Sequence, residues 1–253
     1  VVINRSMHGY VMNKAAEDRI FAEYSGAVKT DSSKWIEKNL NFFYQSLFTQ
    51  VKFSAEIIEE KWEEFKQAGL GKVDDMCVIP APLLNMALAK PSDSVVSFWT
   101  PLAIYKQLAR KEKEKIAGIK IFCDGALGVF TAALSKPYRQ GNAGTNLLLN
   151  DEELMSAIER AEEEKDCLAL HVLGDAAIDQ ALKIVAKKAA SKKRLPMIRF
   201  EHAEFISQEQ AYRAKSLGIV LCMQPNFSAD ALSYRERLPS GYDARINNFR
   251  MLI

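Results

Sequence analysis

The segment Gly118-Ile-Lys-Ile-Phe-Cys-Asp-Gly-Ala-Leu-Gly128 has the apolar pattern of a buried strand followed by a glycine-containing turn. A lysine, Lys120, stands in the middle of the strand-like part. A charged amine inside a buried strand is unfavourable unless a nearby group compensates its charge. We therefore expect Lys120 to have a specific partner or a chemical role.

Two later segments share this strand-like pattern, and each ends in a histidine. Cys167-Leu-Ala-Leu-His171 and Ile198-Arg-Phe-Glu-His202 hold two of the three histidines in the chain. These two histidines stand about 30 residues apart, which is the length of one βα unit. Because α/β folds place their chemistry at the carboxyl ends of parallel strands, we expect Lys120 and both histidines to lie near one end of adjacent strands.

Strand-like and helix-like segments alternate through the second half of the chain. Apolar residues spaced three or four apart predict helices, and short apolar runs predict strands. The predicted strands are 117–123, 167–172, 196–202 and 219–223, and the predicted helices are 151–166, 175–188 and 207–216. Ser207 and Gln210 fit a capping box for the last of these helices. Such alternation builds an α/β fold with a parallel sheet and right-handed crossovers.

The first half of the chain is less regular. The predicted elements are a helix at 54–68 that Ser54 caps, strands at 72–79 and 94–99, and one helix at 102–115. The whole chain thus offers six or seven strand candidates. We interpret residues 1–253 as a single domain, in which the aromatic-rich segment 20–53 is an insertion or a lid.

The composition is that of an ordinary globular protein, with 253 residues, 48% hydrophobic and 26% charged, and a net charge of +2. The small net charge predicts neither a nucleic-acid nor a membrane partner. No apolar stretch reaches the roughly 18 residues of a membrane span. The four cysteines lie in apolar runs without CxxC spacing. They indicate buried free thiols and a cytoplasmic protein.

Two interpretations of Lys120 stay open on the sequence alone. Lys120, Phe122 and Asp124 share one face of the strand, so Asp124 or another carboxylate can neutralise the amine, or the side chain can extend to the rim of the barrel. Alternatively, a neutral amine in a desolvated site takes up carbon dioxide and becomes an anionic carbamate, a ligand that bridges two metal ions. The spacing alone favours the neutralised lysine.

The strand-end histidines also have two interpretations. His171 and His202 either bond to backbone carbonyls or bind a metal as neutral imidazoles. Two such histidines at matching strand ends favour zinc-type ligation. Asp175 fits the cap of the following helix, and Glu201 and Glu204 offer carboxylates for orientation or salt bridges.

Signatures of several other enzyme classes are absent from the sequence. There is no dinucleotide-binding fingerprint, no Walker loop and no Gly-x-Ser-x-Gly elbow. His8 lies in a short polar stretch, where a surface loop position and a contact with substrate are both consistent with the sequence.

A series of motifs, in order along most of the chain, resembles the amidohydrolase superfamily. The nearest subgroup is amidohydrolase family 3, the YtcJ-like metal-dependent hydrolases. The motifs are Ser6-Met-His-Gly-Tyr-Val-Met-Asn-Lys-Ala-Ala16, Val73-Asp-Asp-Met76, Ile119-Lys-Ile-Phe-Cys-Asp-Gly-Ala-Leu-Gly128, Thr131-Ala-Ala-Leu-Ser-Lys-Pro-Tyr138, His171-Val-Leu-Gly-Asp175, Arg199-Phe-Glu-His-Ala203 and Met223-Gln-Pro-Asn226.

The resemblance implies an incomplete (β/α)8 barrel of the TIM type, with parallel strands and outer helices. It also implies one or two divalent metals, zinc foremost, and hydrolysis of an amide or cyclic amide, a carbon–nitrogen bond, by metal-bound hydroxide. By position, Lys120 would be the carbamylated bridging ligand, and His171 and His202 the ligands from later strands. His8 and Asn226 would contact a small-molecule substrate.

Two parts of the family's site have no counterpart in this sequence, namely the first-strand His-x-His pair and the final-strand aspartate. The catalytic general base would therefore lie outside this chain. Since the chain also begins without a methionine, inside an apolar run, we expect a piece of a longer protein that is inactive alone. The alternatives are a non-catalytic scaffold or binding module, or another metal-barrel hydrolase such as a deaminase. Assembly into a homo-oligomer stays open.

Overall fold

The computed structural model describes residues 2–3, 8, 10–22, 33–48, 54–78, 81–89, 95–140, 146–191 and 194–252. In these residues the central element is a six-stranded sheet with the order β3-β4-β5-β6-β7-β8, in which all neighbouring strands are parallel. The strands are β3 (Val73–Asp75), β4 (Val96–Pro101), β5 (Gly118–Phe122), β6 (Leu168–Val172), β7 (Ile198–His202) and β8 (Val220–Cys222). Near the N-terminus, β1 (Val2–Ile3) and β2 (Tyr10–Val11) form a separate antiparallel pair.

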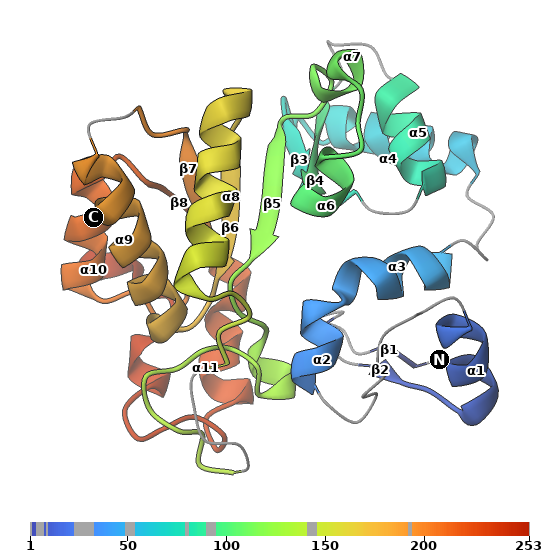
Figure 1. Cartoon of the computed structure of the whole chain (residues 1–253). Helices are drawn as coiled ribbons and strands as arrows, with labels where there is room; N and C mark the ends of the chain where they lie inside the picture. The colour runs from blue at the N-terminus through green and yellow to red at the C-terminus, as the bar shows by residue number, and fades with distance from the viewer. Residues whose placement is uncertain are drawn as a thin grey trace.

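From β3 onwards helices follow the strands along the chain, and those of the second half cover the outer face of the sheet (Figure 1). The α-helices are α1 (Lys14–Phe21), α2 (Ser33–Lys38), α3 (Leu40–Phe48), α4 (Ala55–Gln67), α5 (Ala81–Ala89), α6 (Leu102–Tyr105), α7 (Arg110–Lys113), α8 (Asp151–Glu164), α9 (Asp175–Ala190), α10 (Gln208–Ser216) and α11 (Asp230–Ser233). The 3-10 turns are η1 (Leu127–Val129), η2 (Pro225–Ala229), η3 (Asp243–Arg245) and η4 (Phe249–Met251). None of the helices in the described ranges is long and apolar enough to cross a membrane.

The sheet is strongly curled, as a barrel wall requires. Arg199 on β7 reaches across its concave side and places Nη1 2.6 Å from the Asp74 Oδ2 of β3, four strands away. Consecutive parallel strands, outer helices and this contact across the interior together make the fold an incomplete (β/α)8 barrel. The fold class predicted from the sequence is therefore confirmed.

The main core lies between the outer face of the sheet and helices α8 and α9. Leu168, Leu170 and Val172 of β6 are fully buried there, packed with the inward stripes of both helices. Each such side chain contributes roughly 1.5–3 kcal/mol on burial. The opposite face of the strands therefore carries the polar side chains, including Lys120 and His171.

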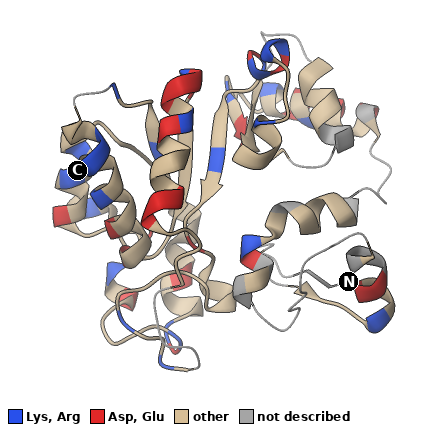
Figure 2. Cartoon of the chain, viewed as in Figure 1, with Lys and Arg blue, Asp and Glu red and all other residues tan. Residues whose placement is uncertain are grey.

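The helix caps predicted at Ser54 and Ser207 are confirmed. Gln210 N donates to Ser207 Oγ at 3.2 Å, and Ser207 N donates to Gln210 Oε1 at 2.8 Å, so the predicted capping box of α10 is present. Ser54 caps α4 as expected, and Trp62 of that helix is buried in the core. Positively and negatively charged residues are interspersed over the outer helices (Figure 2), in keeping with the small net charge.

The first half differs from the prediction in several elements. The expected helix 102–115 is wrong as a single element, because Ala109 N donates to Glu112 Oε2 at 2.7 Å and starts a second helix, α7, after a break from α6. Strand β3 is shorter than predicted, because Asp75 Oδ1 accepts the amide of Cys77 at 3.3 Å and turns the chain away. Helix α5 was not predicted.

The aromatic-rich segment contains α2 and α3. Leu40 and Phe43 of α3 are buried and form one cluster with Ile104 of α6, against which Phe122 of β5 packs. The segment thus lies beside the carboxyl end of β5 (Figure 1). Its remaining parts, 23–32 and 49–53, lie outside the described residues, and its role as an insertion or a lid stays a prediction.

Candidate functional site

The polar side chains of β5 and β6 share the inner face of the barrel wall. In the parallel register Lys120 lies opposite Ala169, and Phe122 lies opposite His171. Neighbours in register on parallel strands point to the same side of a sheet. Lys120 and His171 therefore face the interior, where both are almost fully buried, with exposures of 4% and 3%.

His202 reaches the same place by a different route. It lies in register with Val172, whose side chain belongs to the outer core, so simple alternation would turn His202 outward. Left-handed backbone angles at His202 (φ 73°) and Ala203 (φ 45°) redirect it. The centre of its ring lies 4.7 Å from that of His171. Such angles cost about 1–3 kcal/mol each and recur at functional sites.

His8 completes the cluster of imidazoles. The centre of its ring lies 5.2 Å from that of His171, and its Nδ1 lies 2.7 Å from the Glu37 Oε2 of α2. The residue is 9% exposed. Of the two sequence-based interpretations, the surface loop position is therefore wrong, whereas contact with a substrate remains a prediction.

Glu37 is a site residue that the sequence did not single out. It is 3% exposed, and its second oxygen, Oε1, accepts the hydroxyl of Thr131 at 2.6 Å. A Cβ on Gly125 would lie 2.3 Å from this same oxygen. The glycine after Asp124 therefore allows α2 to dock on the turn that follows β5. One acidic residue inside an aromatic-rich segment gave no signal for this role.

The two strand-end imidazoles have defined hydrogen bonds. His171 Nε2 lies 2.9 Å from the carbonyl oxygen of Gly125. A carbonyl only accepts, so Nε2 carries the proton and Nδ1 keeps its lone pair. His202 Nδ1 likewise faces Gln224 Oε1 at 2.7 Å, and the Gln224 amide is oriented by donating to the Cys222 carbonyl at 3.1 Å. This leaves the lone pair of His202 on Nε2.

Both histidines are held in the neutral form. Burial, together with the neighbouring His202, His8 and Lys120, lowers the pKa of His171 well below its ordinary value. Burial and the nearby Lys120 lower the pKa of His202 to about 4. Neutral imidazole is the form that binds metals.

The amine of Lys120 has an unusual environment. Burial lowers its pKa, while the negative charge of Glu201 acts in the opposite direction. Among the described residues its Nζ has no hydrogen bond or ion pair, and it lies 5.4 Å from the centre of the Phe122 ring. The expected neutralisation by Asp124 is wrong.

Asp124 instead binds backbone amides at the end of the strand. Its oxygens accept the N–H groups of Ala133 at 2.9 Å, Leu173 at 2.9 Å and Gly174 at 2.8 Å. Burial raises its pKa to about 7, against the effect of these three donors. Asp124 thus fixes the turns around His171. Its Oδ1 lies 3.8 Å from His171 Nε2.

Three further predictions concern carboxylates. Asp175 does not cap α9, because Gly174 is the capping residue. The Asp175 carboxylate instead accepts hydrogen bonds from Ser135, Tyr242 and Arg245, so its role is structural. Glu201 forms a salt bridge, as expected, with Arg199 at 2.9 Å. Glu204 forms none in the described residues, and burial raises its pKa to about 8.

Asn226 lies in η2 with an exposed side chain. Two other residues of this region contact the cluster instead. Gln224 bonds to His202, and the ring of Phe227 stacks on His202 with centres 5.6 Å apart and an interplanar angle of 14°. A substrate contact by Asn226 stays a prediction.

The donor set can be tested for its fit to a divalent metal. His171 Nδ1 and His202 Nε2 are two imidazole donors on one buried wall, and imidazole suits zinc. Lys120 lies beside them and would bind a metal through oxygen once carbamylated. In the described ranges, no three His, Cys, Asp or Glu side chains form a ready-made metal cage. The residues present fit one part of a metal shell. Lys120 belongs to that part, although lysine is not one of the four residue types counted in such a cage.

Several known proteins share sequence or fold with this chain. The model of the amidohydrolase family matches residues 79–246. YtcJ from Bacillus subtilis (strain 168) is 32% identical over 127 residues, which cover 47% of this chain and 24% of that protein. The chain thus spans about a quarter of that relative.

Two solved structures have the same fold. An uncharacterized metal-dependent hydrolase from Pyrococcus horikoshii OT3 superposes with a TM-score of 0.68 at 25% identity, over 85% of this chain and 46% of its own. A second one, from Pyrococcus furiosus, has a TM-score of 0.66 at 22% identity, over 98% of this chain and 55% of its own. Since the family model matches well over half of its residues, this chain belongs to the amidohydrolase family.

Proposed function

We propose that this chain forms the central part of a metal-dependent hydrolase that cleaves non-peptide carbon–nitrogen bonds, in amides or cyclic amides. One observation carries the proposal: a buried amine on β5 and imidazoles from β6 and β7 lie together on the inner face of the barrel wall. The family membership and the metal-dependent relative from Pyrococcus horikoshii OT3 support it.

In this proposal Lys120, His171 and His202 hold one or two divalent metals, most simply zinc. A metal bound there would polarise the substrate carbonyl and bring the pKa of a bound water near neutrality. Burial favours the neutral amine of Lys120, which is the form that adds to carbon dioxide and gives a carbamate ligand. The general base would come from residues outside this chain.

Two residues would act on the substrate. Glu37 holds the ring of His8 against His171, which places His8 beside the proposed metal ligands. Asn226, on the exposed turn η2, would meet the part of the substrate that enters last. All four cysteines are free thiols, which supports a cytoplasmic location.

The metal content of the longer protein tests the proposed ligands. Lys120→Ala, His171→Ala and His202→Asn should each lower the zinc bound per chain, measured by plasma mass spectrometry after dialysis. His8→Asn is the matched control, because it alters an imidazole in the same cluster that is assigned to substrate. Unchanged zinc in the three ligand variants, or equal loss in the control, would contradict the assignment.

A non-catalytic scaffold is the competing proposal. It is favoured by the lack, in the described residues, of a cage of three or more His, Cys, Asp or Glu side chains. Hydrolysis of a panel of amides by the zinc-loaded longer protein would exclude it. Zinc binding without any turnover would favour the scaffold. Turnover of amino-heterocycles alone would favour a deaminase.

A further inference from the structure

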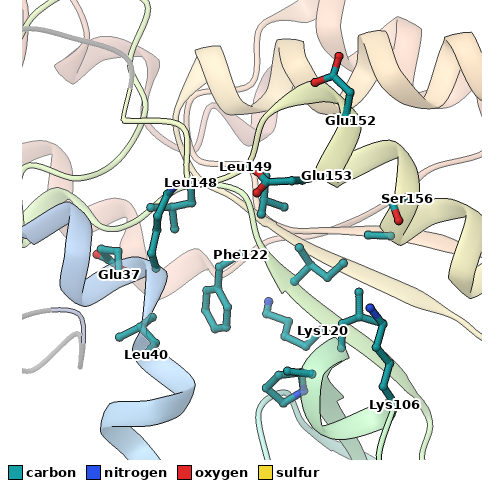
Figure 3. Close-up of a pocket in the computed structure, with 16 residues that line it drawn as sticks. Glu37, Leu40, Lys106, Lys120, Phe122, Leu148, Leu149, Glu152, Glu153 and Ser156 are labelled. Atoms are coloured by element: carbon teal, nitrogen blue, oxygen red, sulfur yellow. The ribbon is translucent and has the colours of Figure 1, made fainter. Parts of the chain in front are cut away.

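We propose that a cavity beside β5 binds a hydrocarbon group attached to the scissile amide, so that the substrates are apolar amides. This inference rests on the proposed function and specifies its substrate class. The cavity has a volume of about 660 Å³ and lies among α2, the start of α3, α6 and α8 (Figure 3). Its volume falls within the roughly 300–1,000 Å³ range of small-molecule sites.

The cavity lies where β4 ends two residues before the end of β5. The pairing of the two strands stops at Pro101, which lies opposite Lys120. Ile121 and Phe122 continue beyond that point without a partner on the β4 side. The wall of the barrel is therefore open here, and the opening leads from the interior to the groove between α6 and α8.

Three residues belong both to the cavity and to the imidazole cluster. Glu37 lines the cavity and bonds to His8, and the ring centre of Phe122 lies 5.3 Å from that of His171. Lys120 lines the cavity as well, and Figure 3 shows its side chain beside the ring of Phe122. A group bound in the cavity would thus end at Lys120, next to the imidazole cluster where the reaction is proposed.

Most of the wall is apolar, with Lys120 and Glu37 at the end next to the imidazole cluster and the remaining charges at the rim. Leu40 and Leu148 are buried wall residues, with exposures of 2% and 4%. Lys106 and Glu152 are exposed at the mouth, where water solvates them. Glu153 is engaged in capping α8, because its Oε2 accepts the Asn150 amide at 2.8 Å. The interior thus offers a hydrocarbon chain few competing polar partners.

The size of the effect follows from burial. Each methylene that leaves water contributes roughly 0.8 kcal/mol, which corresponds to about a fourfold gain in kcat/KM per added carbon. The gain should stop when the chain fills the cavity. A flat site on the barrel surface would show no such dependence.

The test uses the zinc-loaded longer protein and two series of probes. The first series is the p-nitroanilides of acetic, butyric, hexanoic and octanoic acids, and the second is acetamides with N-alkyl groups of the same lengths. We expect kcat/KM to rise steeply with chain length in one series. Ser156→Trp, on an exposed position of α8 that lines the cavity, should flatten that rise. Ser216→Trp, an exposed serine on α10 outside the cavity, is the matched control.

The outcomes separate this inference from the proposed function. Hydrolysis without dependence on chain length in either series overturns the cavity assignment and leaves the hydrolase intact. If no probe is hydrolysed, calorimetric titration with hexanamide and acetamide replaces the rates. If hexanamide binds more tightly than acetamide and Ser156→Trp removes this preference, the cavity assignment is supported even though the proposed hydrolase function is not. Equal affinities, or equal effects of the two tryptophan variants, overturn it.

Discussion

Gly174 lies at the closest backbone approach near the site, and its replacement by alanine gives a clear prediction. A Cβ added there would lie 2.0 Å from the carbonyl oxygen and 2.4 Å from the carbonyl carbon of Ala133. Atoms in ordinary contact stay beyond about 3.4 Å, so the Ala133 backbone would have to move by more than 1 Å. No flexible side chain can absorb this shift, since both contacts are to backbone.

The required movement would break buried hydrogen bonds. Ala176 N donates to Ala133 O at 3.0 Å, while Ala133 N and Gly174 N both donate to Asp124. A buried group left without its partner costs about 1–3 kcal/mol, so two such losses amount to about 2–6 kcal/mol. At roughly 2–4 °C per kcal/mol for a domain of this size, the melting temperature should fall by about 10 °C.

Circular dichroism of thermal and urea unfolding measures this loss. Gly71→Ala is the matched control, because nothing lies within 4 Å of a Cβ at that position. The control should be neutral or stabilising by up to about 1 kcal/mol, since alanine reduces the entropy of the unfolded chain. If Gly174→Ala unfolds within 1 kcal/mol of the wild type, the packing argument for this turn is refuted.

Three further outcomes are expected. Thr131→Val removes the hydroxyl that donates a hydrogen bond to Glu37, so amide hydrogen exchange in residues 33–48 should become about 5- to 30-fold faster. Unchanged exchange would show that α2 docks by other contacts. Ser207→Ala should cost about 1 kcal/mol in urea unfolding through loss of the cap of α10, and a smaller loss than 0.3 kcal/mol would argue against that cap. Since the pKa of His202 is lowered to about 4, the neutral ring favours folding above pH 6.5, and this contribution is lost as the pH falls from 6.5 towards 4. His202→Gln should therefore lose less stability than the wild type over that range in metal-free buffer, and parallel pH curves would contradict the assigned pKa.

The second half of the fold was predictable because its signals are local. Strands β5 to β8 and helices α8 to α10 lie within a few residues of the predicted ranges. Apolar periodicity and the Ser207 cap both act within one or two turns of the chain. Such signals can be read from one sequence without knowledge of distant contacts.

The details of the site depended on contacts between distant residues. Glu37 lies 29 positions from His8 and 94 from Thr131, and no local pattern marks it as the residue that joins them. The ring of His202 faces inward only because the backbone takes left-handed angles after β7. Alternation along a strand would have placed that ring in the outer core.

The polar interior explains why Lys120 forms no ion pair with the carboxylates of the described residues. Arg199 donates to Asp74 at 2.6 Å and to Glu201 at 2.9 Å, so its guanidinium engages two interior carboxylates. A guanidinium stays charged at all accessible pH values and holds both acids in fixed geometry. Glu201 is therefore close enough to influence Lys120 but already has a cationic partner. The arginine keeps the interior electrostatically balanced, and the amine is left to desolvation, which favours its neutral form.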